Sequence, residues 1–185
     1  ISRDMGPGNC LINEWIRRNK KGNYDSGGDL ANSGKTDILI LNQALEDFEN
    51  ILGSKKNSFD VNDFEINFLR GLDLADGAST ITDFTSSIIA SNLSIELSKS
   101  NNNISKIILC GGGRKNKTLI KRIEEYSDKK ITFDTTDRYD VDGDFVESQA
   151  FAYLAIRSCL KLPISFPNTT GCKLPLTGGI LVKNF

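Results

Sequence analysis

Residues 106–116, KIILCGGGRKN, decide the fold of this chain. The run Lys106–Cys110 is short, apolar and β-branched, which predicts a buried parallel strand. Gly111, Gly112 and Gly113 follow it, and a helical pattern begins near Asn116. Glycines let a backbone pass close to a flat ring or a phosphate. The turn matches neither GxGxxG nor the phosphate-binding loop pattern, so a purely structural turn, with Asn116 as a helix cap, is equally compatible with it.

The segments around this stretch alternate between helical and extended patterns. A second short strand is expected at Ile131–Phe133, and a closing element at Gly179–Val182 after a loop-like tail. This alternation favours an α/β fold, and so few strands suggest an incomplete sheet. The expected helices begin or lie at 10–16, 37–52, 63–70, 74–97, 116–126 and 144–160. The last of them is expected to bury one stripe, formed by Val146, Ala150, Tyr153, Leu154 and Leu160.

Composition narrows the function classes. The 185 residues carry a formal net charge of −1, which gives no general attraction to nucleic acid or anionic lipid. There is no histidine, so a general base must be a carboxylate, Lys, Tyr or Cys. The four cysteines form no CxxC pair, and we expect inert, buried thiols in a reducing compartment. No apolar run reaches membrane-spanning length, and we see no signal peptide, so a cytoplasmic location is expected.

Residues 4–9, DMGPGN, form a tight loop that opens directly into a helix. Asn9 is the expected N-cap of that helix. The arrangement aims backbone N–H groups at whatever lies before the helix and places the Asp4 carboxylate beside them. Asp4 is therefore a candidate base or Mg²⁺ ligand, although a carboxylate that only caps the turn remains an alternative.

Residues 134–147 hold six carboxylates. Their spacing does not fit an EF-hand, so calcium is not favoured. An acidic helix start fits better, because Asp142 and Asp144 suit the positive end of a helix. Glu147 stands three residues after Asp144, as in a capping box, so a structural role and a site role are both open.

Read together, these loops resemble the anhydro-N-acetylmuramic acid kinase family over nearly the whole chain. Residues 4–9 with Leu11, Ile12 and Trp15 resemble its DTGPGN…L…W segment, and residues 110–116 resemble its CGGG..N loop. Residues 136–155, with Thr136-Asp137, Asp142–Asp144 and Glu147, are similar to its TD…DGD..E..AFAWLA stretch. Weaker likenesses lie at Tyr24-Asp25 with Gly28, Phe64, Leu72, Asp76–Ala78, Thr170-Gly171 and Gly178–Ile180.

This resemblance implies one lobe of an actin-like (ribonuclease H-like) ATPase fold, with 1–185 as a single C-terminal lobe. It implies ATP and Mg²⁺ as cofactors, and conversion of 1,6-anhydro-N-acetylmuramic acid into N-acetylmuramic acid 6-phosphate in cell-wall recycling. Asp4 matches the family's catalytic aspartate. The nucleotide loop corresponds to Gly111, Gly112, Gly113 and Asn116, and the sugar side to Gly6, Gly8, Asn9 and Glu147. A homodimer stays open as an expectation.

The sequence also departs from the family pattern. Met5 stands where Thr is usual, which removes a hydroxyl beside the catalytic loop, and Asn13 stands where Asp is usual. The chain lacks an initiator Met, and the family's N-terminal half with its Gly-Ser phosphate loop has no counterpart here. We therefore expect the chain alone not to turn over. A non-catalytic remnant that binds a nucleotide or a partner is the alternative, and an unrelated α/β binding protein is a third.

Overall fold

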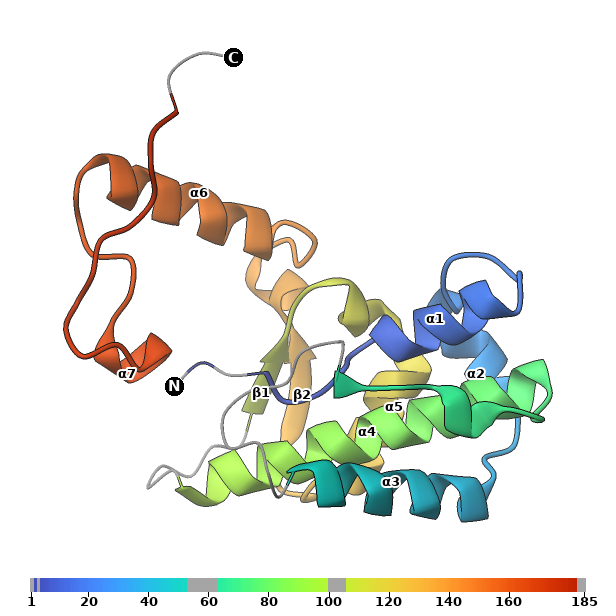
Figure 1. Ribbon diagram of the computed structural model, residues 1–185. Coiled ribbons are helices and arrows are strands. Elements are labelled where there is room, and N and C mark those ends of the chain that lie inside the picture. The colour runs from blue at the N-terminus through green and yellow to red at the C-terminus, as the bar shows by residue number, and fades with distance from the viewer. Residues whose placement is uncertain (1, 3, 53–62, 100–105, 183–185) are drawn as a thin grey trace.

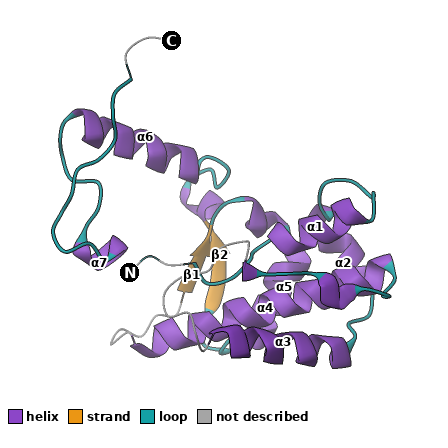
Figure 2. Ribbon diagram, in the orientation of Figure 1, coloured by secondary structure: helices purple, strands orange, loops and turns teal. Residues whose placement is uncertain are grey.

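The computed structural model describes residues 2, 4–52, 63–99 and 106–182, and is helix-rich with a small parallel sheet (Figures 1 and 2). The α-helices are α1 Cys10–Arg18, α2 Asp29–Ser33, α3 Ile38–Leu52, α4 Leu74–Lys99, α5 Lys117–Tyr126, α6 Val146–Cys159 and α7 Pro167–Thr170. The strands are β1 Lys106–Leu109 and β2 Thr132–Thr135. Short 3₁₀ helices lie at Ser26–Gly28, Asn67–Leu69, Gly112–Lys115 and Thr136–Tyr139.

The two strands and α5 form a β-α-β unit, as the sequence predicted. β1 and β2 pair in parallel, with a register running from Lys106 opposite Thr132 to Leu109 opposite Thr135. The prediction that β1 is buried is wrong, since Ile108 is 49% exposed. Parallel sheets are normally covered on both faces. In the described part of the chain, one face of this sheet has no such cover over Ile108.

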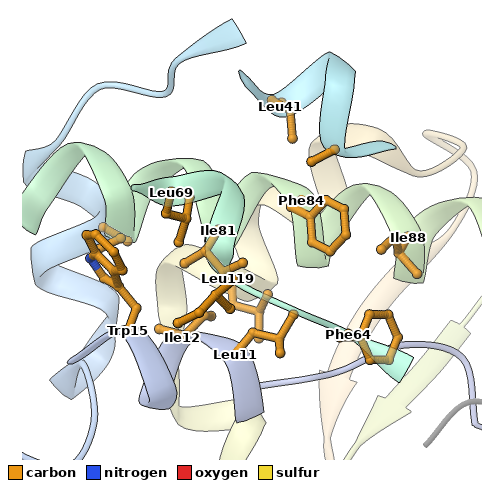
Figure 3. Packing of buried hydrophobic residues seen from close by; sticks show 14 of the residues in the cluster. Leu11, Ile12, Trp15, Leu41, Phe64, Leu69, Ile81, Phe84, Ile88 and Leu119 are labelled. Carbon is orange, nitrogen blue, oxygen red and sulfur yellow. The ribbon is translucent and has the colours of Figure 1, made fainter. Parts of the chain in front are cut away.

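The long helix α4 lies at the centre of the core and contacts α1, α2, α3 and α5 (Figure 1). Figure 3 shows Leu11 and Ile12 of α1 and Leu119 of α5 gathered around Ile81 of α4. Trp15 lies across Gly77, and its indole N–H donates to the Leu74 carbonyl at 2.9 Å. Residues from helices far apart in sequence thus converge on one helix.

Helix α4 is buried on more than one face, although it is rich in hydroxyl side chains. Ser79, Thr80, Thr82, Thr85 and Ser86 are all fully buried. Most of these hydroxyls are satisfied within the helix: Thr82 donates to the Ala78 carbonyl at 2.7 Å and Ser86 to the Thr82 carbonyl at 2.8 Å. Back-bonding of this kind removes the cost of burying a hydroxyl.

The chain from α6 onward lies apart from the α1–α5 body, on the other side of the strands (Figures 1 and 2). The buried stripe predicted for α6 is wrong, because Tyr153 is 59% and Leu160 64% exposed and Ala150 is exposed too. The closing element expected at Gly179–Val182 is also wrong. The structure instead has a single antiparallel bridge between Ser165 and Leu176.

Two further expectations need correction. The helix expected at residues 63–70 is reduced to the 3₁₀ turn Asn67–Leu69 over the part described, in which Phe64 and Leu69 are buried. The cysteines are all free, as expected, but none is buried: Cys10, Cys110 and Cys159 are exposed, and Cys172 is half-buried.

Candidate functional site

The Asp4 loop is held on the side of α4. The Asn92 side chain, 7% exposed, donates from Nδ2 to the Met5 carbonyl at 3.0 Å. Pro7 is buried, and its carbonyl accepts from the Cys10 amide at 3.1 Å, which starts α1. Gly6 and Gly8 are half-buried in the loop, while the Asp4 side chain is exposed. The loop is therefore anchored behind Asp4, and the carboxylate faces outward.

The glycine turn leaves open space beside its backbone. Gly111 has φ +74°, a left-handed conformation that favours glycine. Among the described residues, leaving out the chain neighbours, no heavy atom lies within 4 Å of the position that a Cβ would take on Gly111 or Gly112. Packing against the described part of the chain therefore does not explain the glycine at 112. The space fits the approach of a flat or phosphorylated ligand to the backbone.

Asn116 joins the glycine turn to the Asp4 loop. Its side chain is 4% exposed, and its Oδ1 accepts from the Leu119 amide at 3.0 Å, which confirms Asn116 as the cap of α5. Its Nδ2 donates to Asn9 Oδ1 at 3.2 Å. Asn9 occupies the N-cap position of α1, as predicted, and its carbonyl accepts from the Asn13 amide at 2.9 Å, but its side chain makes no cap bond to α1. The amide of Asn9 is instead used to bring two distant loops together.

Gly28 lies directly beneath Asn116. Thr118 donates from Oγ1 to the Gly28 carbonyl at 2.7 Å. A Cβ on Gly28 would overlap Asn116 Oδ1 and lie 2.7 Å from Thr118 Cβ. The nearby Asp25 caps α2, because its two carboxylate oxygens accept from the Leu30 and Ala31 amides, each at 2.9 Å. The segment that contains Asp25 and Gly28 therefore supports the site from behind.

Arg114 joins the glycine turn to the acidic loop. Its guanidinium donates to Asp137 through two nitrogens at 2.7 and 2.9 Å, and to Asp144 at 2.6 Å. It also donates to the Gly111 carbonyl at 3.0 Å. Lys115 adds a 2.5 Å ion pair to Asp144. The three loops that the sequence singled out are thus connected in one line: the Asp4 loop, the glycine turn, and residues 136–144.

The ion pairs shift the pKa values of Arg114 and of its two carboxylate partners. Hydrogen bonds from Arg114 hold the pKa of Asp137 and that of Asp144 below the usual value for a carboxyl group. In turn, the hydrogen bonds to Asp137 and Asp144 raise the pKa of Arg114. Both carboxylates therefore stay ionised at neutral pH and are committed to Arg114.

Glu147 lies in the first turn of α6, as predicted, and is exposed. The capping box is wrong, because the N-cap position is Phe145 and Asp144 bonds Arg114 and Lys115 instead. Across the described residues, no hydrogen bond joins Glu147 to the Asp4 loop or to the glycine turn. Its place on the sugar side stays a prediction.

Two features are absent from the described residues. Among residues 2, 4–52, 63–99 and 106–182, no group of three or more Cys, Asp or Glu side chains is arranged to hold a metal ion. No helix in the same residues is long and apolar enough to cross a membrane. The carboxylates nearest the glycine turn, Asp137 and Asp144, are already taken by Arg114, so they do not fit a Mg²⁺ site.

Comparison with known proteins gives the same family that the motifs in these loops resemble. The sequence profile of the anhydro-N-acetylmuramic acid kinase family matches residues 1–183. This chain belongs to the anhydro-N-acetylmuramic acid kinase family. Its curated relatives include proteins of that name from Pelagibacter ubique, 52% identical over 100% of this chain and 49% of the relative, and from Brucella canis, 35% identical over 99% and 48%. A third, from Rhizorhabdus wittichii, is 38% identical over 97% of this chain and 47% of the relative. The chain spans about half the length of the curated relatives it matches.

In this member of the kinase family, the sequence did not predict the roles of three residues that connect the Asp4 loop, the glycine turn and the acidic loop. Arg114 was visible only as a cation next to the glycine turn, and nothing predicted its partners 23 and 30 positions away. Gly28 was quoted as part of a motif but not as the support of Asn116. Asn92 gave no signal, because an amide within a helical pattern does not reveal that it bonds a loop 87 positions earlier.

Proposed function

We propose that the full-length protein is an ATP-dependent kinase of 1,6-anhydro-N-acetylmuramic acid that yields N-acetylmuramic acid 6-phosphate in cell-wall recycling. This chain supplies the C-terminal lobe of an actin-like fold. The observation that carries the proposal is the Asn9–Asn116 hydrogen bond at 3.2 Å. It places the loop with the candidate base directly against the turn with the candidate nucleotide site.

In this proposal the exposed Asp4 carboxylate is the general base. It takes a proton from a water molecule whose oxygen attacks C1 of the sugar, and the bond between C1 and O6 breaks. The freed O6 then attacks the γ-phosphorus of ATP, and ADP leaves. Such a transfer depends on positioning and charge stabilisation more than on covalent work by the protein.

The other proposed roles rest on the resemblance of these loops to the family motifs. Gly111, Gly112 and Gly113, with Asn116, hold the nucleotide, because open space borders the first two glycines. Gly6, Gly8, Asn9 and Glu147 contact the sugar. Kinases of this kind use Mg²⁺ with ATP. Asp137 and Asp144 are paired with Arg114 and are not assigned to Mg²⁺, and no step above depends on a metal ligand from them.

The test is a coupled kinase assay on the full-length protein with the anhydro-sugar and ATP, comparing wild type, Asp4→Asn and Glu124→Gln. Glu124 is a matched control, because it is an exposed carboxylate on α5. Loss of a general base lowers kcat by about 100- to 10,000-fold, so Asp4→Asn should fall by this factor while Glu124→Gln keeps wild-type turnover. Substantial turnover by Asp4→Asn would sink the assignment of the base. No turnover by the wild type would sink the proposed kinase activity itself.

A further inference from the structure

Arg114 has an environment unlike that of an ordinary surface cation. Its side chain is only 7% exposed, whereas its partners Asp137 and Asp144 are 45% and 42% exposed. The fork of two parallel hydrogen bonds to Asp137 fixes the plane of the guanidinium as well as its position. Exposed single ion pairs contribute little, but a nearly buried guanidinium with several partners holds one geometry.

Arg114 helps to fix the orientation of the backbone peptide groups of Gly111. The carbonyl of Gly111 accepts from Arg114 at 3.0 Å, and its amide donates to the Gly143 carbonyl at 2.9 Å. Both backbone polar groups of the first glycine in the turn are therefore fixed by Arg114 and the acidic loop. The open space for a ligand borders this same residue.

The acidic loop is itself gathered around Arg114. The Gly143 amide donates to Asp137 Oδ1 at 3.4 Å, and Gly143 lies so close to the guanidinium that a Cβ there would come within 2.6 Å of Arg114 Cζ. Asp144 leads directly into α6, whose first turn carries Glu147. One side chain thus connects the turn on the nucleotide side to the helix that carries the sugar-side candidate.

We propose that Arg114 is a positioning residue, which fixes the glycine turn against the acidic loop and so sets the affinity of the turn for ATP. The inference rests on the proposed function. Arg114 itself needs no contact with ATP, because four of its five N–H donors are already used by Asp137, Asp144 and Gly111. Its effect passes through the orientation of the Gly111 peptide groups.

The test compares wild type, Arg114→Gln, Arg114→Lys and Asp137→Asn in the full-length protein. The matched control is Lys121→Gln, which removes one positive charge from an exposed ion pair with Glu125 on α5. Calorimetry gives the Kd for ATP, and the coupled assay separates KM from kcat. Amide hydrogen exchange at Gly111 reports directly on the bond to Gly143.

Misplacement of a binding group by about 1 Å costs up to about 100-fold, so Arg114→Gln should weaken ATP binding by about 10- to 100-fold and speed exchange at Gly111. Asp137→Asn should do the same in part. Arg114→Lys should be intermediate, because it keeps the charge and loses the fork. The double variant Arg114→Gln with Asp137→Asn should lose less ATP-binding free energy than the sum of the two single losses, because both single changes remove the same contact. Lys121→Gln should match the wild type.

Three results are decisive. Wild-type ATP affinity and wild-type Gly111 exchange in Arg114→Gln would overturn the positioning role. The role would also be overturned if the drop in ATP affinity came with a lower midpoint of thermal unfolding and if exchange rose evenly over the whole chain rather than specifically at Gly111. No ATP binding by the wild type would overturn the proposed function, and Gly111 exchange would then still decide whether Arg114 holds the turn.

Discussion

Gly28 shows how a single residue behind the site controls one within it. Its φ of +79° and the overlap that any Cβ would make with Asn116 Oδ1 both require glycine at this position. The cap of α5 and the bond from Asn116 to Asn9 both depend on the place of that side chain.

We therefore predict that Gly28→Ala destabilises the chain by about 2–4 kcal/mol, the sum of left-handed strain and a lost cap. Gly71→Ala is the control, because Gly71 also has a left-handed backbone, with φ +98°, but no atom lies within 4 Å of its Cβ position. It should cost about 1–2 kcal/mol. Urea unfolding measures both values. Equal costs for the two variants would show that contact with Asn116 does not matter.

Residue-scale reading of the sequence was most reliable where one residue serves its own neighbourhood. The capping of α5 by Asn116 was predictable, because the cap bonds an amide three positions on. The roles of the Asn9 and Asp144 side chains were not, because each bonds a partner more than 25 positions away. Spacing along the sequence does not reveal such a partner, and for Asp144 the partners are charged, which makes these hydrogen bonds strong.

At the scale of elements, the acidic loop between β2 and α6 is held largely by charge. Asp137, Asp142 and Asp144 face Arg114, and Lys115 adds a second cation to Asp144. The pKa of Asp137 and that of Asp144 are lowered by hydrogen bonds from Arg114.

A pH dependence follows from these shifts. Because the folded pKa values lie below the usual value of 3.8 for Asp, the stabilisation is complete above that value and is lost as pH falls through the folded values. We predict that hydrogen exchange at Gly111 and Gly143 is constant from neutral pH down to about pH 5, after correction for intrinsic rates, and rises below about pH 4. In Arg114→Gln the exchange should be fast already at neutral pH. A wild-type loop that opened between pH 5 and 7 would contradict this assignment.

The order of helices and strands was largely predictable, since α1, α3, α4, α5 and α6 all carry apolar residues at helical spacing. Burial was predictable only where a partner element is present. The stripe on α6 has the right spacing to be buried, yet in the described part of the chain only Val146 and Leu154 are half-buried and the other three members are exposed. Periodicity reports which face an element would bury, whereas the partner comes from the rest of the fold.

At the scale of the whole molecule, the exposed apolar surface is concentrated from α6 onward. Phe151 is 65%, Ile156 61% and Ile180 92% exposed. Contiguous apolar surface of this kind binds hydrophobic dyes. The chain spans about half the length of the curated relatives it matches.

We predict that the 185-residue chain raises the fluorescence of the dye ANS, and that Phe151→Gln with Ile156→Gln removes most of the increase. Leu39→Gln is the control, because Leu39 on α3 is 82% exposed but lies away from this surface. It should leave the signal nearly unchanged. A chain that bound no dye, or a signal unaffected by the α6 variants, would show that the surface is not accessible in solution.

The closeness of Gly143 to Arg114 has a consequence for how this protein can change over evolutionary time. A side chain at position 143 would overlap the guanidinium unless Arg114 moved away from its partners, so we expect a mutation there to be better tolerated after the arginine has been replaced by something shorter. Once that replacement has occurred, Asp137 and Asp144 lose their common cation and are free to drift as well. We therefore expect positions 114, 137, 143 and 144 to change together during evolution, with the first substitution at position 114.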